Sequence, residues 1–132
     1  MMQEATYKID EHENYTVITI LADKLTAIVA PDLKTELVVL KGKGVKNIII
    51  NLEKAIYCDS SGLSIVLIAN RICKEGNGCF VVCALQHAVE KLVDISQLTN
   101  ILNITPTVSE AVDFIFMDEL ERGLSDSEEN LN

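Results

Sequence analysis

The chain has 132 residues, of which 48% are hydrophobic and none is Trp, and its formal net charge is -9. This length predicts a single domain that buries a mainly aliphatic core. The acidic balance, without a cluster of Lys and Arg, argues against nucleic acid or a membrane of anionic lipid as a direct partner.

The first half of the chain alternates between strands and a helix. Its predicted elements, in chain order, are strands over 6–10 and 15–21, a helix over 30–40 and a strand over 46–51. Pro31 suits the first turn of the helix, while Leu33, Leu37 and Leu40 recur at helical spacing. The last run is apolar, β-branched and continuous, which predicts a central strand that is buried on both faces.

The second half continues this alternation. Its predicted elements are a helix over 60–75, a strand over 79–84, a helix over 87–94, a strand over 101–104 and a helix from 107 to about 120. Gly76, Asn77 and Gly78 end the first helix, and Thr107 with Glu110 has capping-box spacing at the start of the last. The residues expected to face the core are Leu63, Val66, Ala69, Ile72, Cys73, Ala88, Val89, Leu92 and Val93.

Strands that alternate with helices predict an α/β fold. We expect a mixed, mostly parallel central sheet with an N-terminal hairpin and about four helices. The predicted domain covers residues 1–122, and residues 123–132 form an acidic tail that is expected to be disordered because it has little to bury. Between Asp118 and Asn132 there are six acids and one base.

The N-terminal sequence, the apolar runs and the cysteine spacing together indicate a reducing, intracellular compartment. The N-terminus lacks a signal-peptide pattern, and no apolar run reaches membrane-spanning length, so we expect a cytoplasmic protein. Cys58, Cys73, Cys79 and Cys83 contain no Cys-x-x-Cys pair. Cys79 and Cys83 lie about 13 Å apart on one predicted strand, too far to share a metal. We expect buried thiols and neither a metal nor another cofactor.

The segment from Cys58 to Leu63 has the strongest functional signal, since it places two serines at a strand-to-helix turn. A phosphate-binding loop would need more glycines or a following Lys. A hydrolase would need an orienting acid and a nearby His; His87 could approach Ser60, but the Gly-x-Ser-x-Gly pattern is absent. We therefore do not expect an enzyme.

Two interpretations of the serines stay open on chemistry alone. Asp59 or Ser60 could simply cap the following helix. Capping does not explain a second serine, nor Gly62, which costs about 1 kcal/mol in a first turn relative to Ala. A modification site at Ser60, with a backbone or partner approaching closely at Gly62, would account for both.

The run Asp59-Ser60-Ser61-Gly62-Leu63 resembles the signature of STAS domains, the anti-sigma-factor antagonist family. The likeness extends over about residues 15–116 and includes the order of strands and helices. It implies a STAS-like fold and a module that captures an anti-sigma factor serine kinase and so frees a sigma factor. It also implies that the kinase phosphorylates Ser60 and that a PP2C-type phosphatase reverses this step.

The sequence departs from the family pattern near the expected partner surface. Members often carry Gly-x-Leu-Asp after the second strand, where this chain has Asp23 and Thr26 at the Gly and Asp positions. Ser64 stands where Gly is common. The resemblance also permits an alternative role, as an accessory STAS subunit of a lipid-transport or stressosome-like assembly.

The helix after the motif is expected to supply the docking surface. At 100° per residue, one stripe lies opposite the core residues. The stripe consists of Ser60, Ser64, Leu67, Ile68, Arg71 and Glu75. On one interpretation Leu67 and Ile68 form an apolar pair for a partner. On the other they fill the margin of the core on a solvated face.

Overall fold

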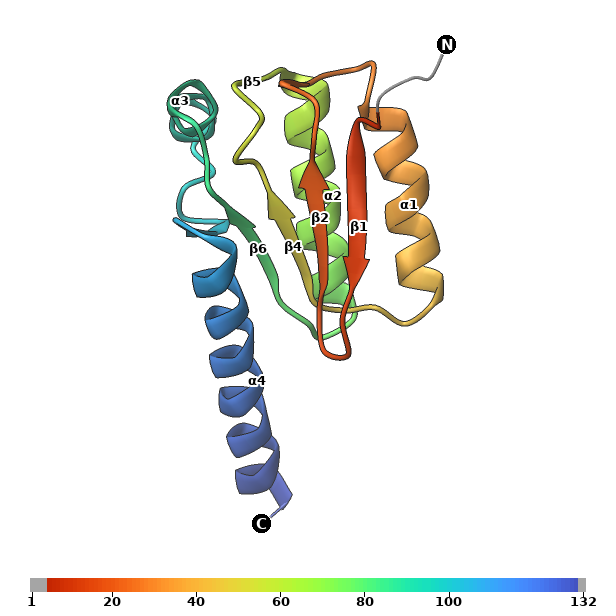
Figure 1. Cartoon of the computed structure of the whole chain (residues 1–132). Helices are drawn as coiled ribbons and strands as arrows, with labels where there is room; N and C mark the ends of the chain where they lie inside the picture. Colours follow the sequence, from red (N-terminus) through yellow and green to blue (C-terminus); the bar gives the residue numbers. More distant parts are fainter. Residues whose placement is uncertain (1–4, 131–132) are drawn as a thin grey trace.

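The computed structural model describes the backbone of residues 5–130 and the side chains of residues 5–123 (Figure 1). Within this range a five-stranded sheet has the strand order β1-β2-β4-β6-β7. Its strands are β1 (Tyr7–Glu11), β2 (Thr16–Ile20), β4 (Ile48–Asn51), β6 (Phe80–Cys83) and β7 (Asn103–Thr105). β1 runs antiparallel to β2, and the other neighbouring pairs are parallel. The predicted α/β fold, with its mostly parallel sheet and N-terminal hairpin, is confirmed.

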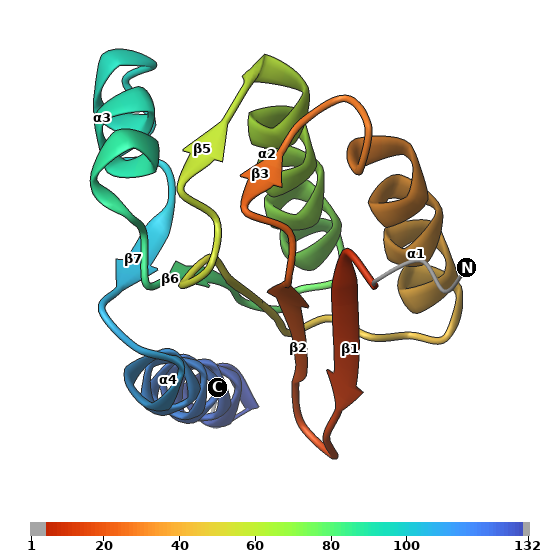
Figure 2. The same cartoon turned by 45° about the horizontal axis from the view of Figure 1, so that its top comes forward.

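Helices cover both faces of the sheet (Figure 2). α1 (Ala30–Gly42), α2 (Ser60–Glu75) and α3 (His87–Ile95) contribute to the larger core cluster on one face, and α4 (Val108–Asn130) packs on the other. In β4, Ile48 and Ile50 belong to the larger cluster, whereas Ile49 belongs to the cluster beneath α4. A strand covered on both faces needs apolar side chains at successive positions, and this explains the continuous apolar run.

A second, very small sheet lies at the end of the molecule where α2 begins (Figure 2). It pairs β3 (Lys24–Leu25) with β5 (Tyr57–Cys58) in parallel. Neither strand shows in the sequence pattern, because two residues are too few to show a period. The pairing holds the segment before α1 against the segment before α2.

Three local predictions were wrong. Ala88 is exposed, although Val89 and Val93 are buried, because α3 packs through a narrow stripe only. β7 begins at Asn103 rather than at residue 101, since the amides of Ile101 and Leu102 both donate to the Leu98 carbonyl in a turn.

The third error concerns the end of α4, which continues to Asn130 instead of stopping near Leu120. No proline follows, Gly123 costs only about 1 kcal/mol in a helix, and Asp118 pairs with Arg122 one turn later at 2.7 Å. The division into a domain and a tail at residue 122 stays a prediction. Among residues 5–130 no helix is both long and apolar enough to cross a membrane.

Arg122 provides a test of this division. Its guanidinium donates to the carbonyls of Asn77 and Gly78 in the turn between α2 and β6. Truncation after Arg122 is expected to change the free energy of unfolding by less than about 0.5 kcal/mol. Truncation after Glu121 removes these bonds and should cost about 1–2 kcal/mol more, as measured by urea denaturation. A large loss of stability in the variant that ends at Arg122 would show that residues 123–132 contribute to the fold.

Candidate functional site

Asp59 organises the start of α2. It is the N-cap residue, and its Oδ1 accepts a hydrogen bond from the Gly62 amide at 2.9 Å. Its Oδ2 accepts a second, longer bond from the Ala27 amide at 3.3 Å, and its own amide donates to the Leu25 carbonyl at 3.2 Å. The capping interpretation of Asp59 is thereby confirmed. The same carboxylate also ties the loop after β3 to the first turn of α2, so the turn that carries the serines is held from two sides.

Gly62 is required by the close approach of β3 to α2. A Cβ atom at this position would overlap the carbonyl oxygen of Leu25 and would lie 2.8 Å from Sγ of Cys58. Leu25 and Cys58 are partners in the small sheet, so neither can move away independently. The backbone that was expected to approach Gly62 closely is therefore the β3 segment of the chain itself.

The two serines differ in their access to solvent. Ser60, the first residue of α2, is exposed, whereas Ser61 is half-buried. The backbone carbonyl of Ser60 accepts a bond from the Ser64 hydroxyl at 2.9 Å. The first turn of a helix presents backbone amides and the positive end of the helix dipole, both of which favour added negative charge. Ser60 is thus the more exposed of the two serines, and it lies at a position that suits an anion.

The residues of α2 that were expected to form the docking surface are polar at the two ends of the helix and partly apolar in the middle. Ser64, Arg71 and Glu75 are exposed, and Glu75 pairs with Lys41 of α1 at 3.1 Å. Leu67 and Ile68 are half-buried and pack against the larger core cluster. This packing agrees with the interpretation that they fill the margin of the core, and a further contact with a partner stays a prediction.

Three exposed apolar residues near this turn were not predicted from the sequence. Ile28 follows the Ala27 amide that binds Asp59, and its side chain is 88% exposed. Ile56 and Tyr57 precede the motif and are 56% and 49% exposed. Only the pairing of β3 with β5 brings Ile28 to the same end of the molecule as Ser60, so no local pattern could have shown it.

The cysteine thiols are protected from ionisation. Burial raises the pKa of Cys58 to about 11, with a smaller contribution from the Asp59 carboxylate. Burial likewise raises the pKa of Cys79 to about 11 and those of Cys73 and Cys83 to about 12. A thiolate nucleophile is therefore disfavoured near neutral pH. The side chain of Cys58 contributes to packing beneath Gly62.

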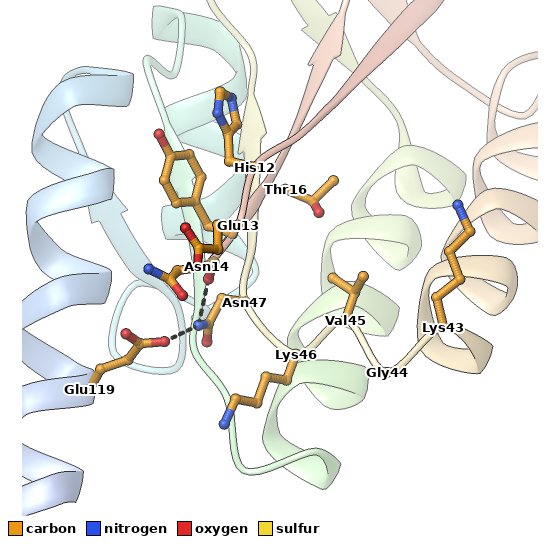
Figure 3. A pocket seen from close by; sticks show the side chains of 11 residues that line it. His12, Glu13, Asn14, Thr16, Lys43, Gly44, Val45, Lys46, Asn47 and Glu119 are labelled. Atoms are coloured by element: carbon orange, nitrogen blue, oxygen red, sulfur yellow. Dashed lines mark hydrogen bonds between the residues drawn. The ribbon is translucent and has the colours of Figure 1, made fainter.

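The turn between β1 and β2 lies at the opposite end of the sheet from the first turn of α2 (Figure 1). Residues of this turn line a polar pocket of about 270 Å³ (Figure 3). Asn47 forms part of its wall and donates to the Asn14 carbonyl at 2.9 Å and to the Glu119 carboxylate at 2.7 Å. His12 also lines the pocket and stacks on Tyr15, with ring centroids 4.5 Å apart. None of the candidate residues around Ser60 contributes to this pocket, so it does not belong to the same site.

Comparisons with known proteins agree with this geometry. The family model described as "STAS domain" matches residues 6–111. An anti-sigma factor antagonist from Mycobacterium paratuberculosis superposes with a TM-score of 0.74 at 19% identity, covering 83% of this chain and 92% of the other. The Bacillus cell fate determinant SpoIIAA in its phosphorylated form gives 0.68 at 22% identity, with 83% and 98% covered. A sulfate transporter family protein from Wolinella succinogenes gives 0.70 at 13% identity, with 81% and 88% covered.

Proposed function

The chain belongs to the STAS domain family, and from this premise we propose that it is an anti-sigma-factor antagonist. In this role the unmodified protein sequesters an anti-sigma factor serine kinase in the cytoplasm and so frees a sigma factor. Phosphorylation of Ser60 by the kinase ends the interaction, and a PP2C-type phosphatase restores it. The protein acts as a switched binding module and not as an enzyme.

The observation that carries the proposal is the exposure of Ser60, the first residue of α2, directly after the N-cap Asp59. The Asp59 carboxylate fixes the turn through Gly62 and Ala27. A kinase can therefore reach the hydroxyl without unfolding the turn. Ser61 is less suitable because part of its surface is already covered.

Added phosphate would act mainly at the partner surface. A phosphoserine adds a charge of roughly -1.5 to -2 at neutral pH. The amides and dipole of α2 offset that charge within the domain, which leaves the fold intact. A partner that covers Ser60, Ser64 and Arg71 would instead have to desolvate the phosphate. Leu67 and Ile68 lie between these residues and complete the proposed contact surface.

Incubation with the cognate kinase and ATP, followed by intact-mass analysis, tests the site. The wild type is expected to gain one phosphate, which peptide mapping should place on Ser60. Ser60→Ala should abolish the modification and retain kinase binding, while Ser61→Ala, the matched control, should still be modified. Ser60→Asp should weaken binding of the kinase about tenfold or more, since a charge that is buried at an interface without a partner costs several kcal/mol of desolvation.

Two results would contradict this assignment. One is a phosphate mapped on Ser61 of the wild type. The other is a Ser60→Asp variant that binds the kinase as tightly as the wild type does. Such a result would mean that the added charge lies outside the interface.

An accessory role in a larger assembly is the alternative function, and the likeness to a sulfate transporter family protein favours it over an enzyme. In such an assembly the STAS domain would act as a subunit and Ser60 would stay unmodified. A protein that gains no phosphate from the kinase, yet purifies with membrane transport subunits, would support this alternative.

A further inference from the structure

The solvent side of α4 carries an apolar stripe that the proposed function does not use. The stripe consists of Phe114, Met117 and Leu120, whose side chains are 39%, 57% and 58% exposed. Their i, i+3, i+6 spacing places them along one side of the helix, away from the buried residues Ala111 and Ile115. We call these three residues the outer stripe. Continuous apolar surface of this kind is typical of an interaction site.

Among the described residues of α4, the charged side chains on the same arc as the outer stripe are all acidic. Glu110, Asp113 and Glu121 are exposed and lie within the same arc of the helix at 100° per residue. The sequence of α4 contains a single base, Arg122. Its guanidinium binds the carbonyls of Asn77 and Gly78 and the Asp118 carboxylate, so it turns toward the body of the protein.

We propose that the outer stripe docks a basic amphipathic helix of another protein. The apolar face of such a helix would cover Met117 and Leu120, and its Lys or Arg side chains would meet the flanking carboxylates. A second copy of this chain is a poor occupant, because it would place acids against acids along the whole contact. An anionic membrane is disfavoured by the same charge.

This surface is separate from the phosphorylation site. α4 covers the opposite face of the sheet from α2 (Figure 2). The basic helix and the proposed kinase can therefore be bound at the same time. The inference does not rest on the proposed function. A negative charge at Ser60 should leave the affinity for the basic helix unchanged.

A synthetic peptide provides the test. The probe is a labelled helix of Leu and Lys, about five turns long, with all Leu on one face. We expect saturable binding by fluorescence anisotropy that weakens as salt shortens the Debye length below about 10 Å. The double variant Met117→Ser/Leu120→Ser should weaken binding about tenfold, which corresponds to the apolar area it loses. Ser60→Asp should bind as the wild type does.

Matched controls separate this site from general attraction to an acidic protein. Val38→Ser alters an equally exposed apolar residue (59%) on α1 and should have no effect on binding. A peptide with Glu in place of Lys, and one with the same composition in scrambled order, should both bind at least about tenfold more weakly. Equal binding of the three peptides, or an unchanged affinity in the double variant, would overturn the proposal. So would self-association of the chain, measured by sedimentation equilibrium, that the double variant abolishes.

Discussion

Gly62→Ala is expected to destabilise the protein by about 2 kcal/mol or more, although Ala is the better helix former by about 1 kcal/mol. The added methyl group would overlap the Leu25 carbonyl and lie 2.8 Å from the Cys58 sulfur. Relief of this overlap requires β3 to separate from α2. The separation would also break the bond from the Ala27 amide to the Asp59 carboxylate and the bond from the Asp59 amide to the Leu25 carbonyl. Thermal unfolding should show a fall in Tm of about 3–5 °C for each kcal/mol lost.

Gly42→Ala is the matched control for this substitution. Gly42 also lies in a helix, in the last turn of α1, but a Cβ there meets no atom within 4 Å. The free energy of unfolding of the Gly42→Ala variant is expected to equal that of the wild type or to exceed it by up to about 1 kcal/mol. If Gly62→Ala proved as stable as the control, β3 could not approach α2 as closely as described. The conclusion that this contact positions the turn of Ser60 and Ser61 would then be wrong.

Asn47→Ala is expected to cost about 3 kcal/mol, because this buried side chain joins three parts of the fold. Its Oδ1 accepts from the Cys79 amide at 2.8 Å, just before β6. Its Nδ2 donates to Asn14 in the hairpin turn and to Glu119 of α4 (Figure 3). Removal of the amide leaves a buried N–H without an acceptor, and each such loss costs about 1–3 kcal/mol. Urea denaturation would measure the change in the free energy of unfolding.

Asn103→Ala offers a comparison with the same change of side chain. The Asn103 amide makes one bond, to the Phe80 carbonyl at 2.9 Å, and it is only part-buried. We expect a loss of about 1 kcal/mol. Equal losses in the two variants would mean that the bond that Asn47 accepts from the Cys79 amide and the bond that it donates to Glu119 add nothing to stability. The attachment of α4 would then depend on its apolar face and on the bonds of Arg122 to the carbonyls of Asn77 and Gly78.

The sequence predicted the long, locally defined elements well. α2 spans Ser60–Glu75, as expected, because Asp59 provides a cap at one end and Gly76 follows at the other. The continuous apolar run before Asn51 identified the central strand. The capping bond from the Glu110 amide to the Thr107 hydroxyl, at 3.1 Å, confirms the predicted start of α4. Local periodicity and capping are short-range properties, so these features could be inferred from neighbouring residues.

The candidate site could be predicted only in part. The motif and the resemblance pointed to Ser60, and its exposure agrees with that expectation. The half-buried state of Leu67 and Ile68 could not be predicted from the sequence, because residues at the margin of the core and residues of a docking face have the same helical spacing. The exposed Ile28 beside Asp59 had no local signal at all.

By itself, the sequence determined the order of the four helices and of the five strands of the main sheet, the buried faces of α1 and α2, and the turn that presents two serines. Tertiary structure alone decided why Gly62 must lack a side chain and which loop stands beside Ser60. Both depend on the pairing of Leu25 with Cys58, residues far apart in the chain. Such a contact gains its energy only when the segments meet in the folded protein, so it leaves no periodic pattern in either segment.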